Sequence, residues 1–230
     1  MKKMLGKDFE KLKKKNVMIV GVGGIGCTAA NLLARMQIRL TIIDSDIVNY
    51  NNLERQILFD KNDLFKKKVI VAKEKLKLFT DIKTADKRLT KENIGRIINK
   101  KTDLIIDCTD NAETRLLIND YCKKNKISWV YTGAVANIGT VYFNATNPDR
   151  ACFQCFNQEK QGETSCDIGV SNSIVNMTAS LAVSIAVEYL ISGNIEKELI
   201  RINLKNNTMT KLSVKKNPEC MACRGKYAYL

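Results

Sequence analysis

The sequence predicts an α/β fold: a Rossmann-like, mainly parallel sheet with helices on both faces, followed by a C-terminal antiparallel hairpin. Two patterns indicate this fold. Short apolar segments alternate with longer segments of helical periodicity, which is typical of βαβ units. A glycine-rich segment follows the first apolar segment, where such folds turn from strand to helix. With 230 residues and 45% hydrophobic content, the chain is expected to form one domain.

The first half is expected to alternate strands and helices in order. Asn16–Val20 predicts the first strand, Cys27–Met36 its helix and Leu40–Ile43 the second strand. Because parallel neighbours need a crossover connection, this order predicts a parallel sheet. The elements that continue the alternation are a helix at Lys66–Phe79, a strand at Ile82–Leu89, a short helix at Asn93–Asn99, a buried strand at Leu104–Asp107, a helix at Ala112–Asn125 and a strand at Ile127–Tyr131.

The pattern changes after Gly133. The segment 148–171 has no apolar period and predicts a mobile or partner-ordered loop. Ile174–Ile191 is apolar on nearly every face, so it is expected to be a helix buried in the subunit or at a dimer contact. The remaining predicted strands, of which the last two form the hairpin, are Gly139–Asn144, Leu199–Leu204 and Thr208–Val214.

Composition excludes several classes of function. The chain has no histidine, so it holds no Ser-His-Asp triad, no His-paired cysteine nucleophile and no His-ligated catalytic zinc. Its net charge of +14 comes mostly from lysines spread along the chain, without an aromatic-plus-basic motif. A nucleic-acid partner is therefore not expected, whereas a basic face would steer an acidic protein partner.

The chain is expected to be cytoplasmic and to make no membrane contact. No stretch reaches about 18 uncharged apolar residues, and the start, MKKMLGKDFEKLKKKN, carries charges where a signal peptide needs an apolar run. In a reducing compartment the eight cysteines are better explained as metal ligands, reactive thiols or core residues than as disulfides.

Two Cys-x-x-Cys pairs predict a structural zinc site. Four thiolates at this spacing suit tetrahedral Zn²⁺ and leave no position open for water. Two unrelated thiol pairs are the simpler alternative, and a redox pair is disfavoured because neither pair starts a predicted helix. The predicted zinc ligands are Cys152, Cys155, Cys220 and Cys223.

The glycine-rich segment predicts an adenine-nucleotide site. Its glycines allow a tight turn and let a phosphate or ribose approach backbone N–H groups, and Asp44 ends the second strand where a carboxylate accepts bonds from ribose hydroxyls. This pair fits NAD as well as ATP. We therefore expect a nucleotide-binding part at 1–147, and a crossover loop, long helix, hairpin and zinc-pinned tail at 148–230. The glycines concerned are Gly21, Gly23, Gly24 and Gly26.

Charged residues further along favour ATP with Mg²⁺. Arg55 offers a fork of donors for phosphate oxygens, and Lys68 offers a positive charge at the α-phosphate. Asp110 follows a buried strand at the edge where α/β sheets hold their ligands, so its carboxylate is expected to bind Mg²⁺. Asp107 is an alternative metal ligand, but as the last strand residue it is expected to be structural.

With these residues in place, the chain resembles the ThiF/MoeB/HesA family, relatives of ubiquitin-activating enzymes. The resemblance rests on VMIVGVGGIGC, IIDSDIVNYNNLERQILF, DLIIDCTDNAETR, GETSC and both Cys-x-x-Cys pairs, and covers nearly the whole chain. It implies a homodimer that adenylates the C-terminal Gly-Gly carboxylate of a ubiquitin-like sulfur-carrier protein with ATP·Mg²⁺, releasing pyrophosphate. The carboxylate is already a nucleophile at neutral pH, which is consistent with the missing histidines.

The resemblance also implies roles for particular residues and partners. Ribose binding falls to Asp44, magnesium binding to Asp110, and phosphate contacts to Asn52, Arg55 and Lys68. Gln56 and Asn111 are also expected to bind the cofactor. Thiamine, molybdopterin and tRNA thiolation pathways all remain open, as does a cysteine desulfurase or sulfurtransferase partner. Family members usually carry an arginine before the first strand that reaches the other subunit's ATP. Here the first arginine is Arg35, so either a lysine such as Lys3 or Lys7 replaces it or the contact is absent.

A further cysteine has two open interpretations. Cys166 occupies the family's position for a thiol that links to the carrier's C-terminus, but the negative neighbours Glu163 and Asp167 are expected to lower its thiolate fraction. For the function of the whole chain, two alternative hypotheses remain: an NAD-dependent oxidoreductase and a non-enzymatic carrier-binding scaffold. The cysteines expected to be small core residues are Cys27, Cys108 and Cys122.

Overall fold

The computed structural model describes residues 2–98, 101–157, 168–193, 195 and 198–230. Among these residues, eight strands form one sheet in the order β3-β2-β1-β4-β5-β6-β7-β8. The pairs from β3 to β5 are parallel and those from β5 to β8 are antiparallel, which confirms the predicted fold class. The strands are β1 (Asn16–Val20), β2 (Arg39–Asp44), β3 (Ile82–Asp86), β4 (Leu104–Asp107), β5 (Trp129–Val135), β6 (Ile138–Asn144), β7 (Leu199–Asn203) and β8 (Thr208–Leu212).

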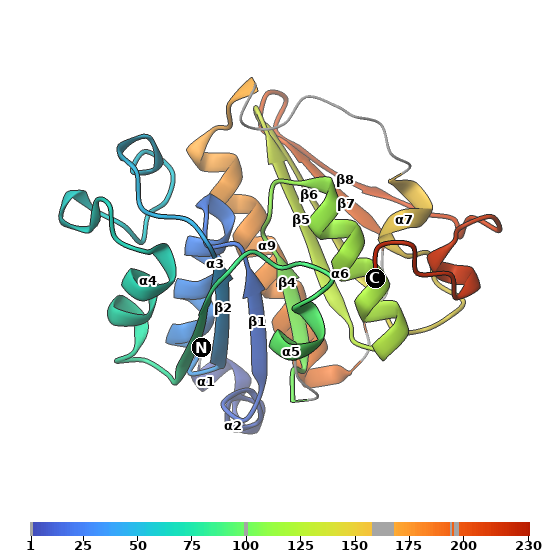
Figure 1. Ribbon diagram of the computed structural model, residues 1–230, viewed down its shortest axis with the longest axis horizontal. Helices are drawn as coiled ribbons and strands as arrows, with labels where there is room; N and C mark the ends of the chain where they lie inside the picture. Colours follow the sequence, from blue (N-terminus) through green and yellow to red (C-terminus); the bar gives the residue numbers. More distant parts are fainter. Residues whose placement is uncertain (1, 99–100, 158–167, 194, 196–197) are drawn as a thin grey trace.

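Helices cover both faces of this sheet (Figure 1). The α-helices are α1 (Lys2–Leu5), α2 (Lys7–Leu12), α3 (Gly24–Arg35), α4 (Lys68–Leu76), α5 (Ile94–Ile97), α6 (Ala112–Asn125), α7 (Phe153–Phe156) and α9 (Asn172–Ser192). The described part of the chain also forms the short 3₁₀ helices η1 (Tyr50–Asn52), η2 (Lys61–Asp63) and η3 (Ala222–Arg224).

Alternation along the central strands divides the core into two layers. In β1, Val17 and Ile19 pack with α3, α4 and α9 on one face, whereas Met18 and Val20 pack with α5 and α6 on the other. Successive side chains of a strand point to opposite faces, so a strand buried on both faces is apolar throughout. The four consecutive apolar residues of β1 therefore reflect its central place in the sheet.

The long helix α9 packs within the core. It lies beside α3 and crosses the antiparallel half of the sheet, where Gly139 leaves room for it: a Cβ there would lie 2.1 Å from Thr178 Oγ1. By length and composition α9 is apolar enough to cross a membrane, so the expectation that no stretch has this character was wrong. Its packing against α3 and the sheet accounts for the apolar composition without a bilayer.

Several element boundaries differ from the sequence prediction. Strand β5 continues past the predicted end at Tyr131 to Val135, because a tight connection at 136–137 pairs it along its whole length with β6. The segment 148–171, predicted to be a loop, contains α7 among its described residues. Helix α4 begins only at Lys68, since Lys67, the residue before it, has an extended backbone and pairs with Ile47 in a β-bridge.

Candidate functional site

The glycine loop joins β1 to α3 at the carboxyl edge of the sheet. Gly21 has a φ of +86°, and a Cβ on it would lie 2.9 Å from the Cys108 carbonyl oxygen. A Cβ on Gly26 would lie 2.0 Å from the Gly21 carbonyl oxygen. Both positions therefore require glycine for the loop to close on itself. Helix α3 starts directly after Gly23 with no side-chain cap, so its first N–H groups remain available to an anion.

Asp44 holds the glycine loop in place. Its two carboxylate oxygens accept bonds from Val22 N at 2.7 Å and from Asp46 N at 2.8 Å. Burial raises the pKa of the Asp44 carboxyl, while the Lys68 ammonium and these two bonds act in the opposite direction. A carboxylate oxygen accepts more than one bond, so Asp44 keeps capacity for ribose hydroxyls at this position.

Lys68 is a buried cation at the same edge. The residue is only 5% exposed, and its Nζ donates to Asp46 Oδ2 at 2.9 Å. Its charge acts on both Asp44 and Cys27, which lie at the glycine loop. Burying an ammonium is costly without an anionic partner. The exposed carboxylate of Asp46 supplies one partner, and a phosphate would supply a stronger one.

The segment after η1 brings Arg55 and Gln56 against the glycine loop. The Arg55 carbonyl oxygen would lie 3.5 Å from a Cβ on Gly24, and Gln56 Nε2 would lie 3.9 Å from a Cβ on Gly23. Gln56 is 4% exposed, and its Oε1 has no hydrogen-bond partner among the described residues. An unpaired buried amide oxygen is uncommon, so this group is suited to a ligand or water.

The side chains of Arg55 and Asn52 make local contacts. Arg55 Nη1 donates to the Asn51 carbonyl at 2.8 Å and to Glu54 Oε1 at 2.7 Å, and its side chain is about one quarter exposed. Asn52 Oδ1 accepts from Asn49 N at 3.1 Å and so fixes the start of η1. A guanidinium has five N–H donors, which leaves Arg55 able to bind phosphate oxygens as well.

The turn after β4 lies on the other side of the glycine loop. Asp107 is fully buried, and its Oδ1 accepts from Thr109 N at 3.0 Å and Thr109 Oγ1 at 2.6 Å, in agreement with the structural role expected for it. Asp110, three residues on, is exposed, and its carboxylate oxygens are of the type that Mg²⁺ prefers. Asn111, expected at the nucleotide, uses its Oδ1 to cap α6 through Thr114 N at 2.8 Å, which leaves its amide N–H₂ as the donor.

Three of the segments that carry the expected nucleotide residues contact one another at the glycine loop. The glycine loop contacts the 55–56 segment on one side and Cys108 and Thr109 on the other. Sequence reasoning overlooked Arg115 of α6, whose Nη2 donates to the Thr109 carbonyl at 2.6 Å. The only signal for it was its place in the DCTDNAETR segment, one helical turn after Asn111.

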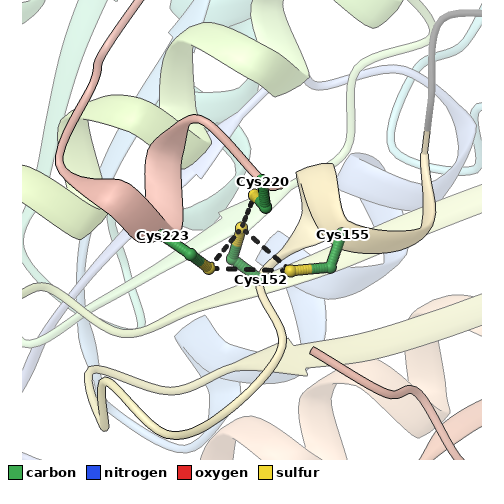
Figure 2. Close-up of side chains that lie close together, drawn as sticks. All are labelled: Cys152, Cys155, Cys220 and Cys223. Carbon is green, nitrogen blue, oxygen red and sulfur yellow. Dashed lines mark hydrogen bonds between the residues drawn. The ribbon is translucent and has the colours of Figure 1, made fainter. Parts of the chain in front are cut away.

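The four cysteines of the two Cys-x-x-Cys pairs converge beside α7 and η3 (Figure 2). Four of their Sγ–Sγ distances are 3.5 Å (Cys152–Cys223), 3.6 Å (Cys152–Cys220), 3.6 Å (Cys155–Cys223) and 3.9 Å (Cys152–Cys155). A tetrahedron of sulfurs about 2.3 Å from a central zinc ion has edges of about 3.8 Å. The sulfurs therefore have the spacing that a four-thiolate metal site requires.

Neighbouring groups hold this cysteine cluster together. Gln154 lies between Cys152 and Cys155, and its Oε1 accepts from Ala222 N at 3.0 Å, which ties the two pairs to each other. Cys152 is the N-cap residue of α7, so the statement that neither pair starts a helix was wrong. The four-sulfur arrangement disfavours a redox role more directly than the lack of a helix did.

The other cysteines separate into two groups. Cys27 and Cys122 are buried as expected, and burial raises the pKa of the Cys27 thiol to about 12. Cys108 is partly exposed, but desolvation raises the pKa of its thiol as well. All three are therefore poor thiolates. Cys166, with its neighbours Glu163 and Asp167, lies outside the described residues.

A family model matches residues 1–222, and its description is the ThiF family. The chain belongs to the ThiF family. This membership agrees with the resemblance found from the nucleotide and cysteine motifs.

Curated relatives include ubiquitin-like modifier-activating enzyme 5 from Drosophila simulans and from Drosophila melanogaster. Each is 28% identical over 240 residues that cover 93% of this chain. The chain spans 59% of the length of these two relatives.

Solved structures with the same fold include E. coli MccB with ATP and PaaA. The MccB structure has a TM-score of 0.81 at 19% identity and covers 94% of this chain and 68% of its own. The PaaA structure has a TM-score of 0.77 at 20% identity and covers 91% of this chain and 67% of its own. At these identities the likeness concerns the fold.

Proposed function

We propose that this chain activates the C-terminal carboxylate of a ubiquitin-like protein by adenylating it with ATP. The observation that carries the proposal is the convergence at the glycine loop: the segment bearing Arg55 contacts it at Gly24, and the turn before Asp110 contacts it at Gly21. Membership of the ThiF family supports the activity, and the names of the Drosophila relatives support a ubiquitin-like partner.

ATP lies over the glycine loop in this proposal. Asp44 accepts from the ribose hydroxyls, and the N–H groups at the start of α3 face the phosphates. Lys68 moves from Asp46 to the α-phosphate, where negative charge builds as the carboxylate attacks. Arg55, with Asn52 and Gln56, binds the outer phosphates. The crystal structure of MccB with ATP supports a nucleotide on this fold.

Asp110 would hold Mg²⁺ at this site. Mg²⁺ keeps most of its water ligands and takes one or two carboxylates, so a single exposed carboxylate beside the glycine loop is sufficient. When bound, the ion neutralises charge on the phosphates and on the leaving pyrophosphate. The substrate carboxylate needs no general base, and the positioning of the reactants and the neutralisation of charge carry the acceleration.

The finer parts of the proposal concern the partner and the assembly. We propose a sulfur-carrier protein ending in Gly-Gly, in a thiamine, molybdopterin or tRNA thiolation pathway, with the whole chain acting as one cytoplasmic adenylation domain. Zn²⁺ at the four cysteines serves as a structural ion. Helices α1 and α2 lie at the edge of the sheet opposite the glycine loop (Figure 1). Lys3 and Lys7 thus lie away from the phosphates of their own subunit, and in a homodimer one of them would contact the phosphates of the other subunit unless this contact is absent.

The test is ATP–pyrophosphate exchange with candidate carriers. Exchange that requires a carrier ending in Gly-Gly, disappears when the two glycines are deleted and is abolished by Asp110→Ala supports the proposal. Exchange without any carrier, or none with any carrier, contradicts it. Tight binding of NAD with no affinity for ATP·Mg²⁺ would instead support the oxidoreductase. Retained cellular function of Asp110→Ala would support the scaffold.

A further inference from the structure

The turn that carries Asp110 is held by a buried network that begins on α6. Arg115 donates from Nη2 to the Thr109 carbonyl at 2.6 Å and to the Thr132 carbonyl at 3.4 Å. Its Nε lies 3.5 Å from Asp107 Oδ2. The guanidinium also lies over the Tyr131 ring, 5.1 Å from the ring centre. One side chain therefore joins α6, β4, β5 and the turn.

All the polar groups of Thr109 are used in this network. Its N–H and hydroxyl donate to Asp107 Oδ1, and its carbonyl accepts from Arg115. The Thr132 hydroxyl in turn donates to the Asp107 carbonyl at 2.6 Å. A residue whose donors and acceptor are all bonded within one network has little freedom to rotate. The conformation of Thr109 is therefore fixed, and with it the position of the Asp110 backbone N–H that follows.

The same turn presses against the glycine loop. A Cβ on Gly21 would lie 2.9 Å from the Cys108 carbonyl oxygen and 3.3 Å from Thr109 N. Cys108 N also donates to the Val20 carbonyl at 2.8 Å. The distance between the Asp110 carboxylate and the glycine loop is thus set by Cys108 and Thr109, which are not expected to contact the metal or the nucleotide.

We propose that Arg115 is a positioning residue for the metal: it clamps the Thr109 carbonyl and the Asp107 carboxylate so that Asp110 faces Mg²⁺ on the nucleotide. This inference rests on the proposed function of the site. Arg115 acts through Asp107 and Thr109, and its side chain is 17% exposed. A lysine keeps the charge but has no planar fork to span the carbonyl and the carboxylate together.

Arg115→Lys, compared with wild type, tests the inference. By titration calorimetry we expect the affinity of Arg115→Lys for ATP in excess Mg²⁺ to be roughly tenfold lower than that of wild type, as for loss of one charged hydrogen bond. When a chelator has removed Mg²⁺, we expect the two proteins to bind ATP with the same affinity. The melting temperature without nucleotide is measured in parallel. The matched control is Arg88→Lys, because Arg88 contacts Glu113 in the first turn of α6 at 3.3 Å but is exposed. This control is expected to match wild type in every measurement.

The outcomes separate this inference from the proposed function. Equal losses of ATP affinity with and without Mg²⁺, or no loss, overturn the positioning role, even if Arg115→Lys also melts earlier. A wild-type affinity for ATP that does not depend on Mg²⁺ overturns it as well. If wild type binds ATP·Mg²⁺ but shows no carrier-dependent exchange, the proposed function fails, while calorimetry on Arg115→Lys still decides the positioning role.

Discussion

Substituting alanine for two glycines of the same loop separates its internal packing from its contact with the nucleotide. In Gly26→Ala the new Cβ lies 2.0 Å from the Gly21 carbonyl oxygen, whereas the closest ordinary carbon–oxygen contacts are about 3.3 Å. The loop must therefore open by roughly 1 Å, at the cost of an overpacked core substitution, about 1–3 kcal/mol. For a chain of this size that corresponds to a melting temperature lower by roughly 2–12 °C.

In Gly23→Ala the new Cβ meets no atom closer than Gln56 Nε2 at 3.9 Å. The residue has a φ of −77° and a ψ of −149°, so it does not need the positive φ that favours glycine. The unfolding free energy is therefore expected to change by no more than about 1 kcal/mol, the usual difference between glycine and alanine at a helix N-cap. The methyl group nevertheless stands where the proposed site places the phosphates, at the first turn of α3.

Scanning calorimetry and titration with ATP·Mg²⁺ measure the two effects separately. We expect Gly26→Ala to lose both stability and ATP affinity, and Gly23→Ala to lose at least tenfold in ATP affinity with its melting temperature nearly unchanged. Wild-type ATP affinity in Gly23→Ala would refute the close approach of phosphate at this glycine. Wild-type stability of Gly26→Ala would refute the loop geometry.

Three further predictions concern single side chains. Lys68→Met keeps the buried stem of a lysine that is 5% exposed, and it should lower carrier-dependent exchange by roughly 10²–10³-fold with a small change in melting temperature. Lys67→Met, at the exposed neighbouring residue, should leave exchange unchanged. Equal effects of the two substitutions would count against a phosphate contact of Lys68. Cys223→Ser should lower the zinc content of the purified protein well below one ion per chain and destabilise the C-terminal tail, whereas Cys122→Ser should retain zinc. Zinc content is measured by atomic emission. A full zinc content in Cys223→Ser would be incompatible with a four-thiolate site. Burial raises the pKa of Asp107 to about 6, above the pKa of this carboxyl in the unfolded chain. The stability that this shift contributes is therefore present below about pH 4 and is lost as the pH rises to about 6. Over this pH range the unfolding free energy of Asp107→Asn, measured by denaturant titration, should fall less than that of wild type, by up to about 3 kcal/mol, and parallel curves would contradict this prediction.

Local sequence signals predicted the parts of the molecule that depend on few neighbours. The glycine loop is one continuous strand–turn–helix segment, so its own pattern was sufficient to predict the turn, although not its contacts with Asp44 and Cys108. The convergence of the four cysteines was predictable because the Cys-x-x-Cys spacing of each pair is the one that four-thiolate metal sites use. The same holds for Asp44, whose place at the end of β2 follows from the length of the strand.

The parts that the sequence did not reveal depend on contacts between distant segments. The role of Arg115 needs β4 beside β5, because Thr109 and Thr132 lie 23 residues apart and meet only through the sheet. The burial of Gln56 depends on the path of the whole crossover segment. Helix α9 has the composition of a membrane span, and only its packing against α3 and the sheet distinguishes it from one.

The central claim is that the carboxylate of another protein attacks the α-phosphorus of ATP held at the glycine loop. An oxygen label tests it most directly: a Gly-Gly carrier with ¹⁸O in its terminal carboxylate is incubated with the protein, ATP and Mg²⁺, and the product is released with hydroxylamine. The account predicts AMP that carries one ¹⁸O from the carrier, in an amount that falls sharply with Asp110→Ala. Unlabelled AMP, or ADP as the nucleotide product, would contradict it.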